Sequence, residues 1–104
     1  MAIVLVKHNI KEYNSWRKVY DEHKTFRTKS GMLTEAVYRS TSNPNEIYLL
    51  FKWDNILNAK IFVQSEELKN AMQKAGVVSK PEMNFLEEAE QITSTRPIMQ
   101  PIKN

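Results

Sequence analysis

The chain has 104 residues, of which 41% are hydrophobic and 26% charged, and its formal net charge is +3 at pH 7. This length suits one domain, and the composition is that of an ordinary globular protein. Lys and Arg are scattered among Asp and Glu, so we expect no nucleic-acid binding. The chain has no Cys, which excludes disulfides, thiolate nucleophiles and Cys-ligated metal sites.

The first apolar run is short and ends at Lys7. It is too short for a signal peptide, and no stretch approaches the roughly 20 apolar residues of a membrane span. We therefore predict a cytoplasmic protein with no membrane partner.

Ala2 to His8 is a nearly continuous apolar run with β-branched residues. It predicts a first strand that is buried on both faces. The periodicity that follows predicts one amphipathic helix from Ile10 to Gly31, ended by the glycine.

The inward side of this helix has an unusual centre line, in which Trp16, Tyr20, His23 and Arg27 recur at helical spacing. A helix that only packed against a core would carry Leu or Ile there. These aromatic and ionisable side chains predict an enclosed, partly apolar space that receives a small molecule.

A hairpin follows the helix, with strands predicted at Met32 to Ser40 and Ile47 to Trp53 and a turn containing Asn43 and Pro44 between them. Both faces of the second of these strands are apolar enough to be buried.

The next region predicts two short helices with a break near Gln64, capped by Asp54 or Asn55 and by Ser65. Gly76 ends the second helix, and Met83 to Glu90 reads as the last strand.

The element order β-α-β-β-α-β predicts an α+β, ferredoxin-like split sandwich over residues 1–90. We expect the sheet order fourth, first, third, second, antiparallel except for a parallel central pair, with the helices on one face. The apolar opposite face predicts a homodimer that packs sheet to sheet. Residues 91–104 predict an extended C-terminal arm on this chain or a partner, with an unattached tail as the alternative.

Three runs resemble the antibiotic biosynthesis monooxygenase-like family: VKHNIKEYNSWRKVYDEH, TSNPNEIYLLFKWDN and NAKIFVQSEELKNAMQKAGVVSKPEMNFLEE. The resemblance spans Val4 to about Glu88, and its most specific parts are the NPNE turn before FKWD and SEELKNAMQKAGV followed by PEMNFLEE. It implies a homodimeric α/β barrel with a small-molecule cleft between the helices and sheet of each protomer. It also implies an aromatic or polyketide-like ligand, with cofactor-independent monooxygenase, cyclase or isomerase chemistry.

Two histidines are the candidate catalytic residues, His23 on the inward helix face and His8 at the end of the first strand. Each could act as a general base or hydrogen-bond an oxygenated ligand. The alternative is a pair of partly buried histidines satisfied by backbone or carboxylate groups. No His-x-x-x-His spacing and no phosphate-binding glycine loop occur, so we expect no metal and no cofactor.

The candidate substrate-binding residues are mostly aromatic and could wall a pocket for a flat ring, although plain core packing is the alternative. They are Trp16, Tyr20, Arg27, Phe51, Trp53 and Phe62. Arg27 would hold a ligand oxygen or form an internal salt bridge. In an enzyme, His23 would take a proton while Arg27 or Tyr20 stabilises the oxyanion. The alternative function is a non-catalytic, small-molecule-binding or stress-linked dimer.

Overall fold

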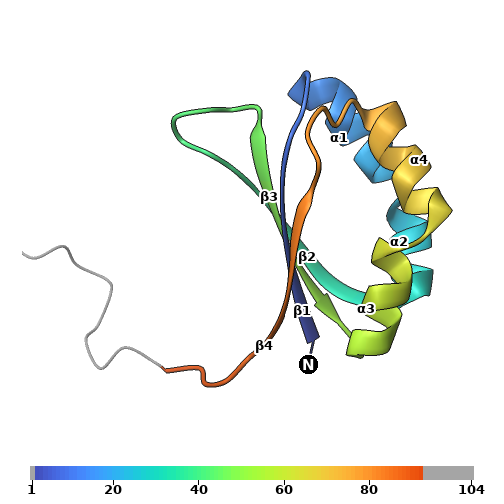
Figure 1. Cartoon of the computed structure of the whole chain (residues 1–104), viewed down its shortest axis with the longest axis vertical. Helices are drawn as coiled ribbons and strands as arrows, with labels where there is room; N and C mark the ends of the chain where they lie inside the picture. Colours follow the sequence, from blue (N-terminus) through green and yellow to red (C-terminus); the bar gives the residue numbers. More distant parts are fainter. Residues whose placement is uncertain (1, 93–104) are drawn as a thin grey trace, which may run out of the picture.

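The computed structural model of the chain describes residues 2–92. Strands and helices alternate as expected for a ferredoxin-like domain (Figure 1). In chain order they are β1 (Ala2–Asn9), α1 (Tyr13–Glu22), α2 (Lys24–Ser30), β2 (Met32–Arg39), β3 (Glu46–Trp53), α3 (Ile56–Val63), α4 (Glu66–Ala75) and β4 (Glu82–Glu87).

The four strands form one sheet in the order β2-β3-β1-β4, and this confirms the predicted order and the α+β, ferredoxin-like class. The predicted parallel central pair is wrong, because β1 and β3 run antiparallel with Val4 opposite Phe51. The first helical crossover, through α1 and α2, returns β2 parallel to β1, and the hairpin then reverses β3. Since β3 lies beside β1, the central pair must be antiparallel.

The predicted single helix from Ile10 to Gly31 is two helices, α1 and α2, which meet at His23. The helix begins only at Tyr13 because Glu12 is extended and its carboxylate caps the first turn. At the break, the carbonyl of Tyr20 accepts hydrogen bonds from the His23 backbone N–H and from the Arg27 guanidinium. The side chain of Arg27 therefore uses a carbonyl that an unbroken helix would reserve for its own backbone.

The second helical region is confirmed as two helices that separate at Gln64. Asn55 caps α3 and Ser65 caps α4, each by accepting a hydrogen bond from a backbone N–H in the first turn. Gly31 and Gly76 end α2 and α4 in the left-handed conformation, with φ of 115° and 82°.

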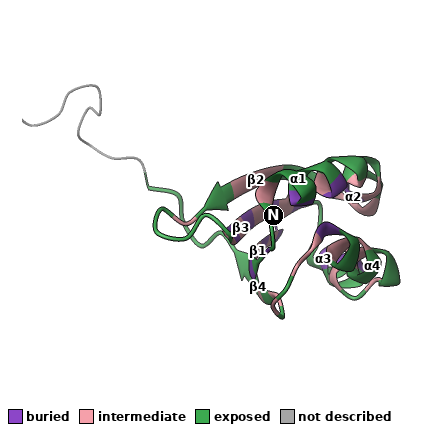
Figure 2. Ribbon diagram, turned by 90° about the horizontal axis from the view of Figure 1, so that it is seen from above, coloured by how far each residue is buried: buried purple, intermediate pink, exposed green. Residues whose placement is uncertain are grey.

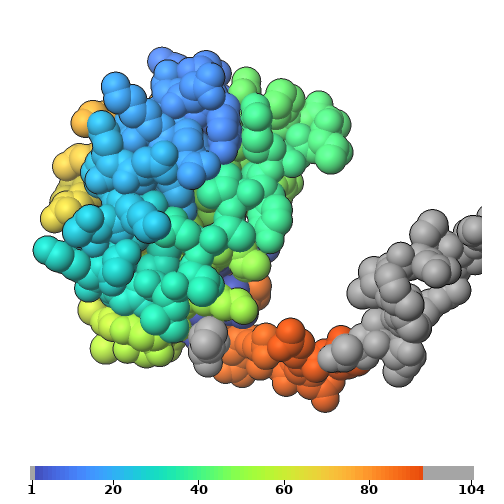
Figure 3. All heavy atoms as spheres, turned by 180° about the vertical axis from the view of Figure 1, so that it is seen from behind, coloured from blue at the N-terminus to red at the C-terminus, as the bar shows by residue number. Residues whose placement is uncertain are grey.

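All four helices cover the same face of the sheet, and the opposite face carries none (Figures 1 and 2). The helices form two pairs, because α1 packs against α4 and α2 packs against α3. From the back of the molecule, α1 and α2 lie beside β2 (Figure 3).

The strand burial alternates along the central strands. In β1, Val4, Val6 and His8 point to the helices and are buried, while Ile3 and Leu5 on the other face stay partly exposed. The prediction that the first strand is buried on both faces is therefore wrong for the single chain. β4 is also shorter than predicted and ends at Glu87.

The predicted C-terminal arm, residues 91–104, lies almost wholly outside the described residues, so it stays a prediction. Within residues 2–92, no helix has the length and apolarity needed to cross a membrane.

Candidate functional site

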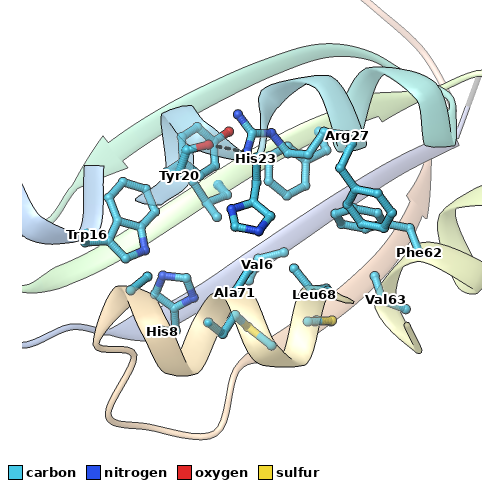
Figure 4. Close-up of a pocket in the computed structure, with 16 residues that line it drawn as sticks. Val6, His8, Trp16, Tyr20, His23, Arg27, Phe62, Val63, Leu68 and Ala71 are labelled. Carbon is cyan, nitrogen blue, oxygen red and sulfur yellow. Dashed lines mark hydrogen bonds between the residues drawn. The ribbon is translucent and has the colours of Figure 1, made fainter. Parts of the chain in front are cut away.

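A cavity of about 70 Å³ lies between the helix pairs and the sheet (Figure 4). Every layer of the fold contributes to its wall, which is mainly apolar. The lining residues are Val6, His8, Trp16, Tyr20, His23, Phe26, Arg27, Leu49, Phe51, Phe62, Val63, Leu68, Ala71, Met72, Ala75 and Met83. The structure thus brings together the inward side of α1 and α2 with both histidines.

His8 is placed in the cavity by the alternation of β1, which turns it to the helix side with Val4 and Val6. It is 4% exposed, and its ring lies edge-on to Trp16 at 5.9 Å between centroids. Among residues 2–92, neither ring nitrogen has a hydrogen-bond partner. Burial lowers the pKa of His8 to about 4, so the ring is neutral at pH 7.

His23 lies at the junction of α1 and α2, and its ring is directed into the space between the helix pairs (Figure 4). Its Nδ1 lies 3.1 Å from the carbonyl oxygen of Val19. A carbonyl only accepts, so Nδ1 is the donor of this hydrogen bond, and in this tautomer Nε2 is the acceptor nitrogen of the ring. His23 is only half-buried, in contrast to His8.

Trp16, Tyr20 and Arg27 form a stacked wall along one side of the cavity. The rings of Trp16 and Tyr20 stack at 4.9 Å with 19° between their planes. The guanidinium carbon of Arg27 lies 3.6 Å from the centroid of the Tyr20 ring, on which it makes a cation–π contact. Trp16 contacts Tyr20, and Tyr20 contacts Arg27, in the order in which they follow one another along the helical face.

Glu35 on β2 binds the polar ends of this wall and was missed by the sequence reasoning. One of its carboxylate oxygens accepts hydrogen bonds from the Tyr20 hydroxyl and from Arg27 Nε at 3.1 Å, and it lies 3.0 Å from Arg27 Nη2. Burial and the Glu35 hydrogen bond raise the pKa of Tyr20 above its usual value. The signal was present in the alternation of β2, where Glu35 pairs with Phe51 and so shares its helix-facing side.

Phe51 and Phe62 line the cavity, whereas Trp53 does not. Trp53 is fully buried in the core, where its ring lies 4.9 Å from that of Phe62. The alternation of β3 correctly predicts that Trp53 is buried. His8, however, pairs with Ile47 at the start of β3, so Trp53 lies at the opposite end of the strand from His8.

The wall contributed by α4 was also missed. Leu68, Ala71, Met72 and Ala75 recur at helical spacing and line the cavity opposite α1 and α2. The amphipathic pattern of this helix indicates which side faces the core but not which part of that side borders an open space. The described residues hold no cluster of His, Cys, Asp or Glu that could bind a metal ion.

Neither a family model nor a curated protein matches the sequence. Solved structures do match. The cofactor-independent oxygenase SnoaB from Streptomyces nogalater superposes with a TM-score of 0.72 over 89% of this chain and 97% of its own, at 8% identity. A putative antibiotic biosynthesis monooxygenase from Bordetella bronchiseptica gives 0.71 over 86% and 97%, at 13% identity.

A third similar structure is a monooxygenase from the gene ActVA-Orf6 of Streptomyces coelicolor, in complex with nanaomycin D. It gives a TM-score of 0.66 over 90% of this chain and 92% of its own, at 13% identity. Likeness at such low identity carries the backbone arrangement rather than the residues of a site. The chain therefore has the fold of the antibiotic biosynthesis monooxygenases, as the sequence resemblance implied.

Proposed function

We propose that the cavity binds a compact, uncharged aromatic molecule that carries one hydroxyl or carbonyl group. The observation that carries this proposal is His8. A buried polar group without a hydrogen bond costs about 1–3 kcal/mol, so such groups normally have partners. The rest of the surrounding wall is mainly apolar, and a polar atom on a bound molecule would satisfy the ring.

The neutral protonation state of His8 supports an uncharged ligand. A neutral imidazole offers one N–H donor and one acceptor nitrogen, which matches a hydroxyl group. A carboxylate would need a positive partner, and Arg27 already pairs with Glu35. Bringing a charge into an apolar space without a free counter-charge is costly.

The size of the cavity supports a ligand at the single-ring end of the range. Its volume of about 70 Å³ is less than the roughly 150 Å³ of an apolar cavity that admits benzene. Binding of a ring therefore requires wall side chains to move. Met72 and Met83 line the space, and Met is the most adaptable apolar side chain.

The matched probes phenol and toluene test this proposal, because they share a shape and differ in a hydroxyl group. We expect phenol to bind wild-type protein about tenfold more tightly than toluene, because its hydroxyl gives the buried His8 ring one hydrogen bond. In His8→Leu the two probes should bind within about threefold of each other. Titration calorimetry measures both affinities. Equal binding of the probes to wild-type protein would remove the proposal.

A second candidate function is cofactor-independent oxygenation of the bound molecule. His23 favours it, because its Nδ1 is held by Val19 and its Nε2 is left as an acceptor at the cavity. SnoaB, which is similar in fold, is a cofactor-independent oxygenase. His23 would remove a proton from an activated CH₂ group, and the carbanion would reduce dioxygen. One oxygen atom becomes a carbonyl and the other leaves as water.

Oxygen uptake tests the second candidate in an aerobic, metal-free screen of phenols, hydroxyquinones and anthrones, of which the anthrones carry the activated CH₂ group. For any substrate found, His23→Ala should lower turnover at least 100-fold, the lower range for a general base, and change affinity less than about threefold. His8→Leu should mainly weaken binding. Binding of phenol without oxygen uptake by any probe would leave the binding function and reject catalysis.

We also propose that two copies pack through their open sheet faces to form the homodimeric barrel. Ile3, Leu5 and Leu50 lie on the side of the sheet away from the helices and are partly exposed in the single chain. Adjacent apolar side chains on an uncovered sheet are typical of an interface. The cytoplasmic location stays a prediction.

A further inference from the structure

Arg27 stands between two spaces. It lines the cavity, and it also borders an outer groove formed with Arg17, Asp21, Lys24 and Glu35. Arg27 itself is 4% exposed. A guanidinium group is always charged, so a buried one requires a negative partner.

Glu35 is that partner, and it lies on the outer side. Arg27 reaches it through Nε at 3.1 Å and Nη2 at 3.0 Å. The other carboxylate of the groove, Asp21, is engaged by Arg17 at 2.8 Å. Glu35 borders the groove but does not line the cavity.

A third nitrogen of Arg27 is held by the backbone. Nη1 donates to the Tyr20 carbonyl at 2.6 Å, and the guanidinium carbon lies 3.6 Å from the centroid of the Tyr20 ring. Glu35 therefore neutralises the positive charge of Arg27 on the side of the outer groove, away from the cavity. An anion that entered would meet a cation that is already paired with a carboxylate.

We propose that Glu35 determines the charge selectivity of the cavity, by neutralising Arg27 so that the site accepts uncharged ring molecules and rejects anionic ones. This proposal rests on the ligand-binding function proposed above. Glu35 does not touch the ligand, so it acts as a specificity-determining residue through Arg27. Removing its charge should turn the same cavity into an anion site.

Glu35→Gln tests this, because glutamine keeps the size and one oxygen acceptor but loses the charge. Benzoate and phenol are the probes. Glu35→Gln should bind benzoate at least tenfold more tightly than wild-type protein does, and phenol affinity should change less than about threefold. Glu87→Gln, an exposed carboxylate on the same sheet, should change neither affinity. A residue that only stabilised the fold would weaken both probes together.

Thermal unfolding provides a second measurement in case Glu35→Gln is poorly folded alone. Benzoate at 10 mM should then raise the melting temperature of Glu35→Gln and leave that of wild-type protein unchanged, because it replaces the lost counter-charge. Glu35→Gln/Arg27→Met should lose the benzoate effect, since the cation is gone.

The outcomes separate the two proposals. If phenol binds wild-type protein but Glu35→Gln gains no benzoate affinity or stabilisation, the role of Glu35 is wrong and the binding function stands. If phenol fails to bind wild-type protein while Glu35→Gln gains benzoate affinity, the role of Glu35 stands and the proposed ligand class is wrong.

Discussion

His8 is a residue whose position is set by the sheet and whose chemistry is set by burial. Alternation along β1 directs it to the helix side, where its ring lies edge-on to that of Trp16. The surrounding apolar groups offer it no hydrogen bond within residues 2–92, and they disfavour its protonated form. A ring with a pKa of about 4 is a weak base, so His8 suits hydrogen bonding better than proton abstraction.

The lowered pKa of His8 predicts a loss of stability in mild acid. Between pH 6.5 and 4 the unfolded chain binds a proton at this residue that the folded chain does not, so stability falls as the pH falls. The difference of about 2.5 pKa units between 6.5 and about 4 corresponds to about 3 kcal/mol. Urea unfolding of wild-type protein and His8→Leu measures this contribution.

The carboxylates titrate in both proteins, so their contribution to the pH dependence of stability cancels when wild-type protein is compared with His8→Leu. Wild-type protein should lose about 3 kcal/mol more than the variant between pH 7 and pH 4. Parallel stability curves for the two proteins would mean that His8 is hydrated in the folded state.

At the scale of elements, the cavity depends on two interrupted helices. α1 and α2 separate at His23, and α3 and α4 separate at Gln64. The two interruptions divide the helical layer into two pairs, in which α1 packs against α4 and α2 packs against α3. The first break also frees the Tyr20 carbonyl for Arg27, which links the helix geometry to the wall of the cavity.

At the scale of the molecule, the open sheet face is the main feature that the single chain leaves unexplained. Its centre is Leu50, which lies on β3 opposite Leu5 of β1 and Ala36 of β2. Lys7 lies between Glu46 and Glu82 near one end of the same face, at 3.7 and 3.8 Å. An apolar centre with charged residues toward its margin is the usual layout of an interface.

Leu50→Lys should therefore convert a dimer into a monomer, because it places a charge at the centre of the proposed interface. Size-exclusion chromatography with light scattering at micromolar concentration gives the mass. Leu57→Lys is the matched control, since Leu57 is 65% exposed on α3, on the other side of the sheet. A wild-type protein with the mass of one chain would reject the dimer.

The fold could be predicted from the sequence because its signals are local. Alternation in β3, the caps at Asn55 and Ser65, and the glycines that end helices each act over a few residues. The break at His23 was missed because it leaves no mark in the periodicity, although it frees the Tyr20 carbonyl for the Arg27 side chain. Periodicity continues across such a break, since the same face remains apolar.

The site was harder to predict because its decisive features join distant parts of the chain. Trp16, Tyr20 and Arg27 share a helical face and could be grouped by spacing, but the Glu35 contact depends on the placement of β2 beside α2. Spacing also cannot separate a residue that lines a cavity from one that fills the core, which is why Trp53 was grouped with Phe51 and Phe62.

The backbone closes both ends of the helical layer. At one end, Lys11 donates to the Gly76 carbonyl at 3.0 Å and ties the start of α1 to the end of α4. At the other end, Asp54 donates to the Gly31 carbonyl at 3.0 Å and ties the end of α2 to the start of α3. For the ligand proposed above, these two ties favour entry between the helix pairs rather than at either end of the layer. His23 is half-exposed and His8 is buried, so such a ligand would meet His23 before His8.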